Sequence, residues 1–330
     1  MRALWGYGVI CLAIGLASCS SADNHTEKAS IDLNGATAEA ALFGEHVIST
    51  GLYERDLAIS GDGETLVYTV GNLAQTTRSL VSMRFSGGQW SSPEILPFSG
   101  EYNDIEPFFA PDGASLYFAS NRPLPERPEG TDYNLWLAPI ASTGWGEPYP
   151  LPPHINTEGD EFYASTTAEG HLYFTATYER GMGTEDIFRS EFKDGDYQPP
   201  VALSTAINTK TYEFNAYVSP AEDVLIFSSF GRADGHGGGD LYLSVKDENG
   251  AWKPAVNMGP AVNSKKLDYC PFVDLKRGAF YFTSNRGELQ SGKFTTLGDI
   301  RADATKALNG GGNIFQMRWD AVSYDELQAP

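Results

Sequence analysis

One sequence plan is repeated five times along this chain of 330 residues, and it constrains the fold more than any other feature. Each copy has a tight-turn signal of Asp, Gly or Pro, followed directly by a short apolar and aromatic run. The five runs are Leu66-Val67-Tyr68-Thr69, Leu116-Tyr117-Phe118-Ala119, Leu172-Tyr173-Phe174-Thr175, Leu225-Ile226-Phe227-Ser228 and Phe280-Tyr281-Phe282-Thr283. A recurrence at roughly 50 residues is typical of a repeat architecture. Because Asp, Gly and Pro supply hairpin geometry, each run is predicted to be a β-strand.

Each copy continues with signals for two more strands. In four copies the third strand begins with an amide or an acid, at Asn134, Asp186, Asp240 and Asn313. An aromatic residue and a Pro then precede a fourth strand, and Pro is tolerated at the start of a strand or on its edge. Four short strands in about 50 residues predict one blade of a β-propeller.

The strand count also predicts how the ring closes. The fifth copy shows no fourth strand after Trp319, whereas residues 41–49 (ALFGEHVIS) resemble a fourth strand ahead of the first copy. We therefore predict an all-β fold, a propeller of five blades with four antiparallel strands each, closed by this N-terminal strand. Closure leaves no open sheet edge. Six blades are the alternative, if a degenerate copy is present.

The first residues predict export and lipid attachment. Arg2 and the apolar stretch VICLAIGLA resemble a signal peptide and are too short to span a bilayer. The stretch Leu16-Ala17-Ser18-Cys19 resembles a bacterial lipobox, which implies lipidation of Cys19. The predicted segments are a lipoprotein signal peptide over 1–18, a flexible tether over 19–40, the propeller over 41–320 and a C-terminal tail over 321–330. Ser20 resembles an outer-membrane sorting signal, so we expect an outer-membrane lipoprotein that faces the periplasm or the exterior.

The net charge of −20 limits the class of partner. Nucleic acid and anionic membrane surfaces would be repelled, so the only expected membrane contact is the lipid anchor. Neutral glycans, cations and other proteins remain compatible. We expect a monomer whose partner is an envelope protein or a glycan.

Three stretches resemble known repeats. The stretch EPFFAPDGASLYFASNR (106–122) resembles the PD40, or WD40-like, β-propeller repeat of TolB-type proteins. The stretch GEP…INTEGDEFYAS (146–165) and the Gly-rich loop before Asp240-Leu241-Tyr242 are similar to related repeats in bacterial envelope lipoproteins. The resemblance covers roughly residues 41–320 and implies the fold. It does not specify the activity, because such propellers serve as scaffolds, as binding domains and as platforms for enzymes.

Alignment of the copies brings one acid to the start of every innermost strand. These acids are Glu54, Asp104, Glu161, Glu213 and Asp268, and two positions later stand Asp56, Glu106, Tyr163, Asn215 and Cys270. Strand direction alternates within a blade, so the fourth-to-first and second-to-third connections share one face, here called the top face. The first set is predicted to ring the channel mouth on this face. The same face should hold Arg122, Arg180, Arg232 and Arg286, near the ends of the second strands.

Two interpretations of this ring stay open. In the first, each acid pairs with a nearby Arg or accepts backbone N–H groups, as a fastening repeated around the fold. In the second, the ring binds a ligand together with Tyr163, Arg122, Arg232 and Arg286. If the protein is an enzyme, its candidate catalytic residues are Asp56, Glu106 and Glu161, because clustered carboxylates can form an acid/base pair for a carbohydrate-active hydrolase or lyase.

The sequence lacks the motifs of metal, nucleophile and nucleotide sites. The five His residues have no zinc-ligand spacing, and there is no nucleophile elbow, Walker loop or Rossmann glycine pattern. We therefore expect no metal site and no cofactor, with Ca²⁺ as the one alternative. The favoured function is non-enzymatic binding of a partner through the top face, with the hydrolase or lyase as the other interpretation.

The top face also carries the unusual loops. The stretch GRADGHGGGDLYLS (231–244) is predicted to join the second and third strands of blade four, with Asp240 bonding the turn and with Asp234 and His236 at the rim. Insertions at 123–132 and 287–312 exceed minimal turns, and long loops in compact domains are often functional.

Overall fold

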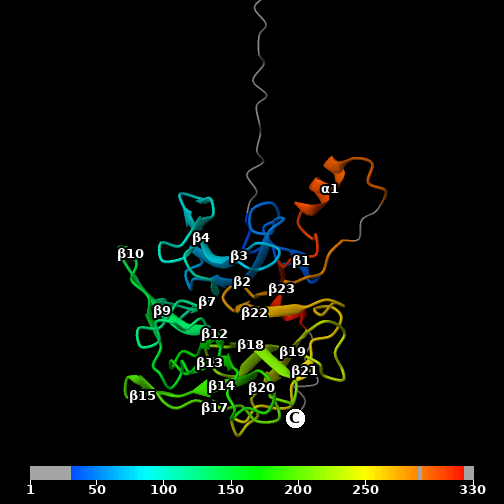
Figure 1. Ribbon diagram of the computed structural model, residues 1–330. Coiled ribbons are helices and arrows are strands. Elements are labelled where there is room, and N and C mark those ends of the chain that lie inside the picture. Colours follow the sequence, from blue (N-terminus) through cyan, green and yellow to red (C-terminus); the bar gives the residue numbers. More distant parts are fainter. Residues whose placement is uncertain (1–30, 289–291, 323–330) are drawn as a thin grey trace, which may run out of the picture.

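The computed structural model describes residues 31–288 and 292–322, which form a five-bladed β-propeller, as predicted (Figure 1). The blades follow one another in chain order around the ring. Their innermost strands contact one another in the cyclic order β2, β7, β12, β18 and β22, and β22 contacts β2 again. The ring is therefore closed.

Four strands build each blade, with short accessory hairpins in three of them. Blade one contains β2 (Tyr53–Ile59), β3 (Thr65–Gly71), β4 (Arg78–Ser86) and β6 (Glu94–Ile95), with β5 (Gln89–Trp90) beside β4. Blade two contains β7 (Asp104–Phe109), β8 (Ser115–Ser120), β9 (Asn134–Ala141) and β11 (Tyr149–Pro150), with β10 (Gly144–Trp145) beside β9. Blade three contains β12 (Glu161–Thr166), β13 (Leu172–Ala176), β14 (Asp186–Ser190) and β17 (Val201–Ala202), and the hairpin β15 (Phe192–Lys193) and β16 (Asp196–Tyr197).

The last two blades have no accessory hairpin among the named strands. Blade four contains β18 (Tyr212–Val218), β19 (Val224–Phe230), β20 (Asp240–Val245) and β21 (Val256–Asn257). Blade five contains β22 (Asp268–Asp274), β23 (Ala279–Ser284), β24 (Asn313–Arg318) and β1 (Ala41–Leu42). The four predicted third-strand starts coincide with the first residues of β9, β14, β20 and β24.

The N-terminal strand closes the ring, as predicted. β1 pairs antiparallel with β24, with Ala41 opposite Gln316. The strand is shorter than the predicted 41–49, because the chain turns at Gly44, which has a φ of 58°. The Gly44 carbonyl accepts the N–H groups of Val47 and Ile48, which ends the extended conformation.

The described end of the predicted tether, residues 31–40, packs on the propeller. Ile31 and Leu33 are buried, and the Trp90 indole N–H donates to the Ile31 carbonyl. The signal peptide, Cys19 and residues 323–330 of the C-terminal tail lie outside the described residues.

The core lies between neighbouring blades and is built from the repeated apolar runs. One aromatic ring from the second strand of each blade is buried, namely Tyr68, Phe118, Phe174, Phe227 and Phe282. Burial of one such ring contributes roughly 1.5–3 kcal/mol to stability, so the repeat stabilises every blade in the same way.

The 287–312 insertion holds the one α-helix of the described residues, α1 (Leu297–Ala304), which projects from the ring (Figure 1). Thr296 begins it with a capping box to Asp299, and none of its residues is buried. Across the described ranges, no helix has the length and apolar character needed to cross a bilayer. The 3₁₀ turn η1 (Trp319–Ala321) follows β24.

Candidate functional site

The acids of blades two, four and five form buried ion pairs with the arginines of their own blades. Asp104 lies 2.7 Å from Arg122, Glu213 lies 3.2 Å from Arg232, and Asp268 lies 2.7 Å from Arg286. All three carboxylates are fully buried. These contacts are those of the fastening interpretation.

Each of these arginines makes two further bonds. Its Nε donates to the serine opposite the acid on the second strand, which is Ser120, Ser229 or Ser284. Its Nη2 donates to a carbonyl of the chain arriving from the previous blade, which belongs to Phe98, Ile207 or Val262. The guanidinium thus joins two strands of one blade to its neighbour, and this unit is called the arginine fastener below.

Blade one fastens its acid without an arginine. The Glu54 carboxylate accepts the backbone N–H and the hydroxyl of Thr50 and the side-chain amide of Asn313. Both of its oxygens are occupied. Burial nevertheless raises the pKa of Glu54.

Blade three has an acid that is only half bonded. Oε1 of Glu161 accepts the N–H of Thr157 at 3.1 Å and its hydroxyl at 2.8 Å. Oε2 is buried and has no hydrogen-bond partner within the described ranges, and Glu161 forms no ion pair there. Burial raises the pKa of Glu161 to about 8, so this side chain is mostly a neutral carboxylic acid at pH 7.

A tyrosine takes the place of the arginine in blade three. Residue 176, opposite Glu161, is Ala instead of Ser, so no hydroxyl is present to receive a guanidinium. The Tyr178 hydroxyl donates to the Ile155 carbonyl, which corresponds to the carbonyl bonded by arginine in the other blades. Arg180 is exposed and stacks on the Tyr178 ring at 4.5 Å.

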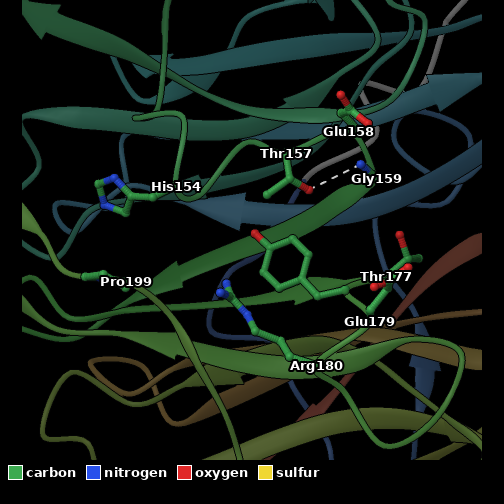
Figure 2. Close-up of a pocket in the computed structure, with 9 residues that line it drawn as sticks. His154, Thr157, Glu158, Gly159, Thr177, Glu179, Arg180 and Pro199 are labelled. Atoms are coloured by element: carbon green, nitrogen blue, oxygen red, sulfur yellow. Dashed lines mark hydrogen bonds between the residues drawn. The ribbon is translucent and has the colours of Figure 1, made fainter.

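A pocket of about 590 Å³ opens beside this altered fastener. It is lined by His154, Thr157, Glu158, Gly159, Thr177, Tyr178, Glu179, Arg180 and Pro199. Figure 2 shows Thr157 and Glu158 on one side of it and Glu179 and Arg180 on the other. The pocket therefore lies between the loop that leads into β12 and the loop that follows β13, on the top face. It is called the blade-three pocket below.

The second set of aligned residues meets at the axis of the ring. Asp56, Glu106, Tyr163, Asn215 and Cys270 all have positive φ, and each lies at the register shift of its innermost strand. Such bulges redirect a side chain. Glu106 accepts the N–H of Tyr163 at 2.8 Å and the amide of Asn215 at 2.9 Å, and the Cys270 thiol donates to Asn215.

Arg55 supplies the positive charge of this centre. Its Nε lies 2.6 Å from Asp56 and its Nη2 lies 2.6 Å from Glu106. The guanidinium also stacks on the Tyr269 ring at 4.8 Å. Burial raises the pKa of Glu106, while the guanidinium of Arg55 opposes that rise.

Within the described part of the chain, this centre holds the one group of side chains that lie close enough together to bind a metal ion. Ligand atoms of Asp56, Glu106 and Cys270 lie within 4.8 Å of one another. The Arg55 guanidinium bonds both carboxylates, so it already supplies the charge that a cation would bring. All four side chains are buried, and burial raises the pKa of the Cys270 thiol.

Tyr163, a predicted ligand contact, spans the centre: its hydroxyl donates to the Pro271 carbonyl at 2.7 Å. Asp240 accepts the His236 N–H and the Asn257 amide, so it bonds the turn as expected. Asp234 accepts the Tyr242 hydroxyl at 2.8 Å. Of the residues predicted on the top face, Arg180 lines the blade-three pocket, and Glu161 is buried behind Thr157 of its lining.

Arg55 and a group of three asparagines have structural roles that the repeat alignment did not predict. Arg55 stands at a position that holds Ile105, Phe162, Phe214 and Tyr269 in the other blades, and a charge among apolar residues was its signal. The second group consists of Asn156, Asn208 and Asn263, whose side chains bond both the N–H and the carbonyl of a third-strand residue. Its signal was the Ile/Val-Asn-Thr/Ser tripeptide that recurs before the innermost strands of blades three, four and five.

No family model and no curated protein sequence matches this chain. Solved structures with a similar chain path include a protein assigned as TolB from Agrobacterium tumefaciens, with 17% identity over 70% of this chain and 69% of that chain and a TM-score of 0.45. The GH43 endo-arabinanase from Bacillus licheniformis has 11% identity over 81% and 93%, with a TM-score of 0.46. The α-L-arabinofuranosidase from Lactobacillus brevis has 9% identity over 82% and 91%, with a TM-score of 0.48. Similarity at this level concerns the fold and says nothing about activity.

Proposed function

We propose that this chain is a lipid-anchored propeller of the bacterial cell envelope, attached to the outer membrane through Cys19, that binds a protein or glycan partner through its top face without catalysing a reaction. The lipobox and the resemblance of the repeats to those of bacterial envelope lipoproteins support the location. The contacts of the acids support binding over catalysis. Most of these carboxylates are already held in ion pairs with Arg55, Arg122, Arg232 or Arg286.

The observation that carries this proposal is the blade-three pocket. Three blades tie down their acid with an arginine, whereas blade three leaves Arg180 exposed beside a pocket of about 590 Å³. Blade one also lacks the arginine, but there Thr50 and Asn313 occupy both oxygens of Glu54. Blade three is the blade whose own aligned arginine is left exposed beside a pocket, and binding sites need such asymmetry. Thr177, Glu179 and Arg180 present hydrogen-bonding groups to a ligand there.

Capture of a partner from envelope extracts tests the proposal. The full-length protein is compared with Arg180→Glu and with the matched control Arg84→Glu, a charge reversal at an exposed arginine of blade one. We expect Arg180→Glu to reduce capture at least about tenfold, because Arg is enriched among interface hot spots, whose loss costs about 2 kcal/mol or more, and Arg84→Glu to leave it unchanged. Equal capture by all three proteins contradicts the proposal.

A carbohydrate-active hydrolase or lyase is the second candidate, favoured by one observation at the centre. Glu106, whose pKa is raised by burial, lies beside Asp56, as an acid beside a base would. Its test is the release of reducing or unsaturated ends from a panel of polysaccharides, with Glu106→Gln as the control. The absence of products across the panel removes this candidate.

A further inference from the structure

A second cavity, of about 720 Å³, lies next to the blade-three pocket. Its lining includes Pro153 and Tyr197, which precede His154 and Pro199 of the first pocket by one and two residues. Nε2 of His154 lies 2.7 Å from the Tyr197 carbonyl, so one contact forms the boundary between the two. Together the two pockets follow the seam between blades two and three, and they are called the seam groove below.

The wall of the second cavity is aromatic and rich in proline. Tyr149 is 50% exposed and Phe192 is 39% exposed, on opposite blades of the seam. The other apolar lining residues are Leu137, Pro150, Leu151, Pro152 and Pro153. The hydroxyls of Tyr117 and Tyr197 bond each other at 2.9 Å, which satisfies the main polar groups of the floor. Such walls fit the apolar and proline side chains of an extended peptide.

The rim of the groove is acidic. Glu126 and Asp196 line the second cavity, and Glu158 and Glu179 line the blade-three pocket. All four side chains are exposed, and none forms an ion pair within the described ranges. Arg180 is the only arginine of the lining, and the chain as a whole carries −20. The field around the groove therefore attracts cations.

We propose that the seam groove binds an extended, basic segment of a partner protein. Its Lys or Arg side chains pair with Glu126 and Asp196, while its apolar or proline residues pack on Tyr149 and Phe192. A backbone carbonyl or an acidic group of the same segment meets Arg180 at the other end of the groove, so Arg180→Glu still weakens capture. This inference rests on the proposed function and deepens it, because the groove begins at the top-face pocket and continues along the seam toward the third-to-fourth strand connection of blade three, where Phe192 and Asp196 lie. A neutral glycan would gain nothing from four unpaired carboxylates at long range.

A peptide array tests the proposal directly. The full-length protein is applied to peptides that combine Pro and Tyr with Lys or Arg, to the same peptides with Glu in place of the basic residues, and to neutral oligosaccharides. We expect binding to the basic peptides alone. The affinity should fall as salt rises, because exposed charge pairs are screened.

Four variants locate the binding surface. Tyr149→Ala and Glu126→Lys should each weaken binding of the basic peptides about tenfold, since aromatic anchors and complementary charges dominate such interfaces. The matched controls on blade one are Phe85→Ala, where the ring is 40% exposed, and Glu94→Lys, where the side chain is exposed. Both controls should bind as the wild type does, and all four sites are exposed enough for the variants to fold.

Three outcomes overturn the inference. They are salt-independent binding to neutral oligosaccharides, binding to no probe, and unchanged affinity of Tyr149→Ala and Glu126→Lys. The proposed function fails separately. If Arg180→Glu loses the envelope partner while the groove variants retain it, top-face binding stands and the basic-peptide inference falls.

Discussion

Blades three and four stabilise a buried glutamate in different ways. Each must bury a glutamate at the start of its innermost strand, Glu161 or Glu213, with no exposed surface on either side chain. Blade four keeps its acid beside the arginine of an arginine fastener. Blade three replaces the arginine by Tyr178, and burial raises the pKa of Glu161 until the acid is mostly neutral at pH 7.

The difference teaches how a repeated position becomes available for function. A buried charge is tolerated only with a partner or after neutralisation. Blade four uses its arginine as that partner, and so its arginine cannot contact a ligand. In blade three the acid is mostly protonated instead, so Arg180 is not needed as its partner and is exposed beside a pocket.

The arginines give the largest expected contrast. Arg232→Ala leaves Glu213 buried without its partner and removes the bond to the Ile207 carbonyl, so we expect it to lower the free energy of unfolding by about 3–5 kcal/mol. Arg180→Ala changes an exposed side chain that forms no ion pair with any residue of 31–288 or 292–322, so we expect a change within about 0.5 kcal/mol. Denaturant unfolding measures both.

If Arg232→Ala does not fold, Arg232→Lys takes its place. Lys keeps the positive charge beside Glu213 but loses the guanidinium bonds to Ser229 and to the Ile207 carbonyl. It should fall between the wild type and Arg232→Ala. If Arg180→Ala destabilises as much as Arg232→Ala, the two blades are fastened alike and the comparison is wrong.

The pH dependence of stability gives the second contrast. The pKa of Glu161 is about 8 in the folded protein and ordinarily 4.5, so folding binds a proton at this site. Its contribution to stability is fully present below about pH 4.5 and is lost as pH rises toward 8, by up to about 1.4 kcal/mol per pH unit. Glu161→Gln should remove that slope and should be more stable than the wild type at pH 8 and above.

Urea unfolding of both proteins between pH 5 and pH 9 checks this, because the difference between them isolates Glu161 from Glu54 and Glu106, whose pKa values are also raised. The matched change Glu213→Gln leaves Arg232 without its carboxylate and should destabilise at every pH in that range. Parallel curves for the wild type and Glu161→Gln would show that Glu161 is ionised in the folded state.

The sequence predicted the fold well, because the repeat itself carries the information. Turn residues, apolar runs and third-strand starts recur in register, and the N-terminal strand was found from the strand count. The site was predicted only in part. Arg180 aligned with the other arginines, but it follows Ala176 by four residues, whereas Arg122 follows Ser120 by two.

The polar centre was beyond prediction for a different reason. Its five residues reach the axis through bulges with positive φ. Glycine usually occupies positions with positive φ, but here Asp56 and Glu106 do, so the sequence gives no sign of the bulge. The convergence of five blades is a long-range property of the closed ring. Only the alignment of the copies suggested that these residues are equivalent.

The smallest expected effect tests whether Tyr178 replaces the arginine as a fastener. Tyr178→Phe keeps the ring, which lies 4.7 Å from the Phe188 ring, and removes the hydroxyl that donates to the Ile155 carbonyl. We expect it to lower the free energy of unfolding by about 1 kcal/mol, because one neutral hydrogen bond is lost and no charge is uncovered. Tyr212→Phe, at a half-exposed ring of blade four, is the control and should change nothing measurable. A loss for Tyr178→Phe as large as that for Arg232→Ala would mean that the hydroxyl also holds Glu161 in place, and no loss would mean that blade three is not fastened at this carbonyl.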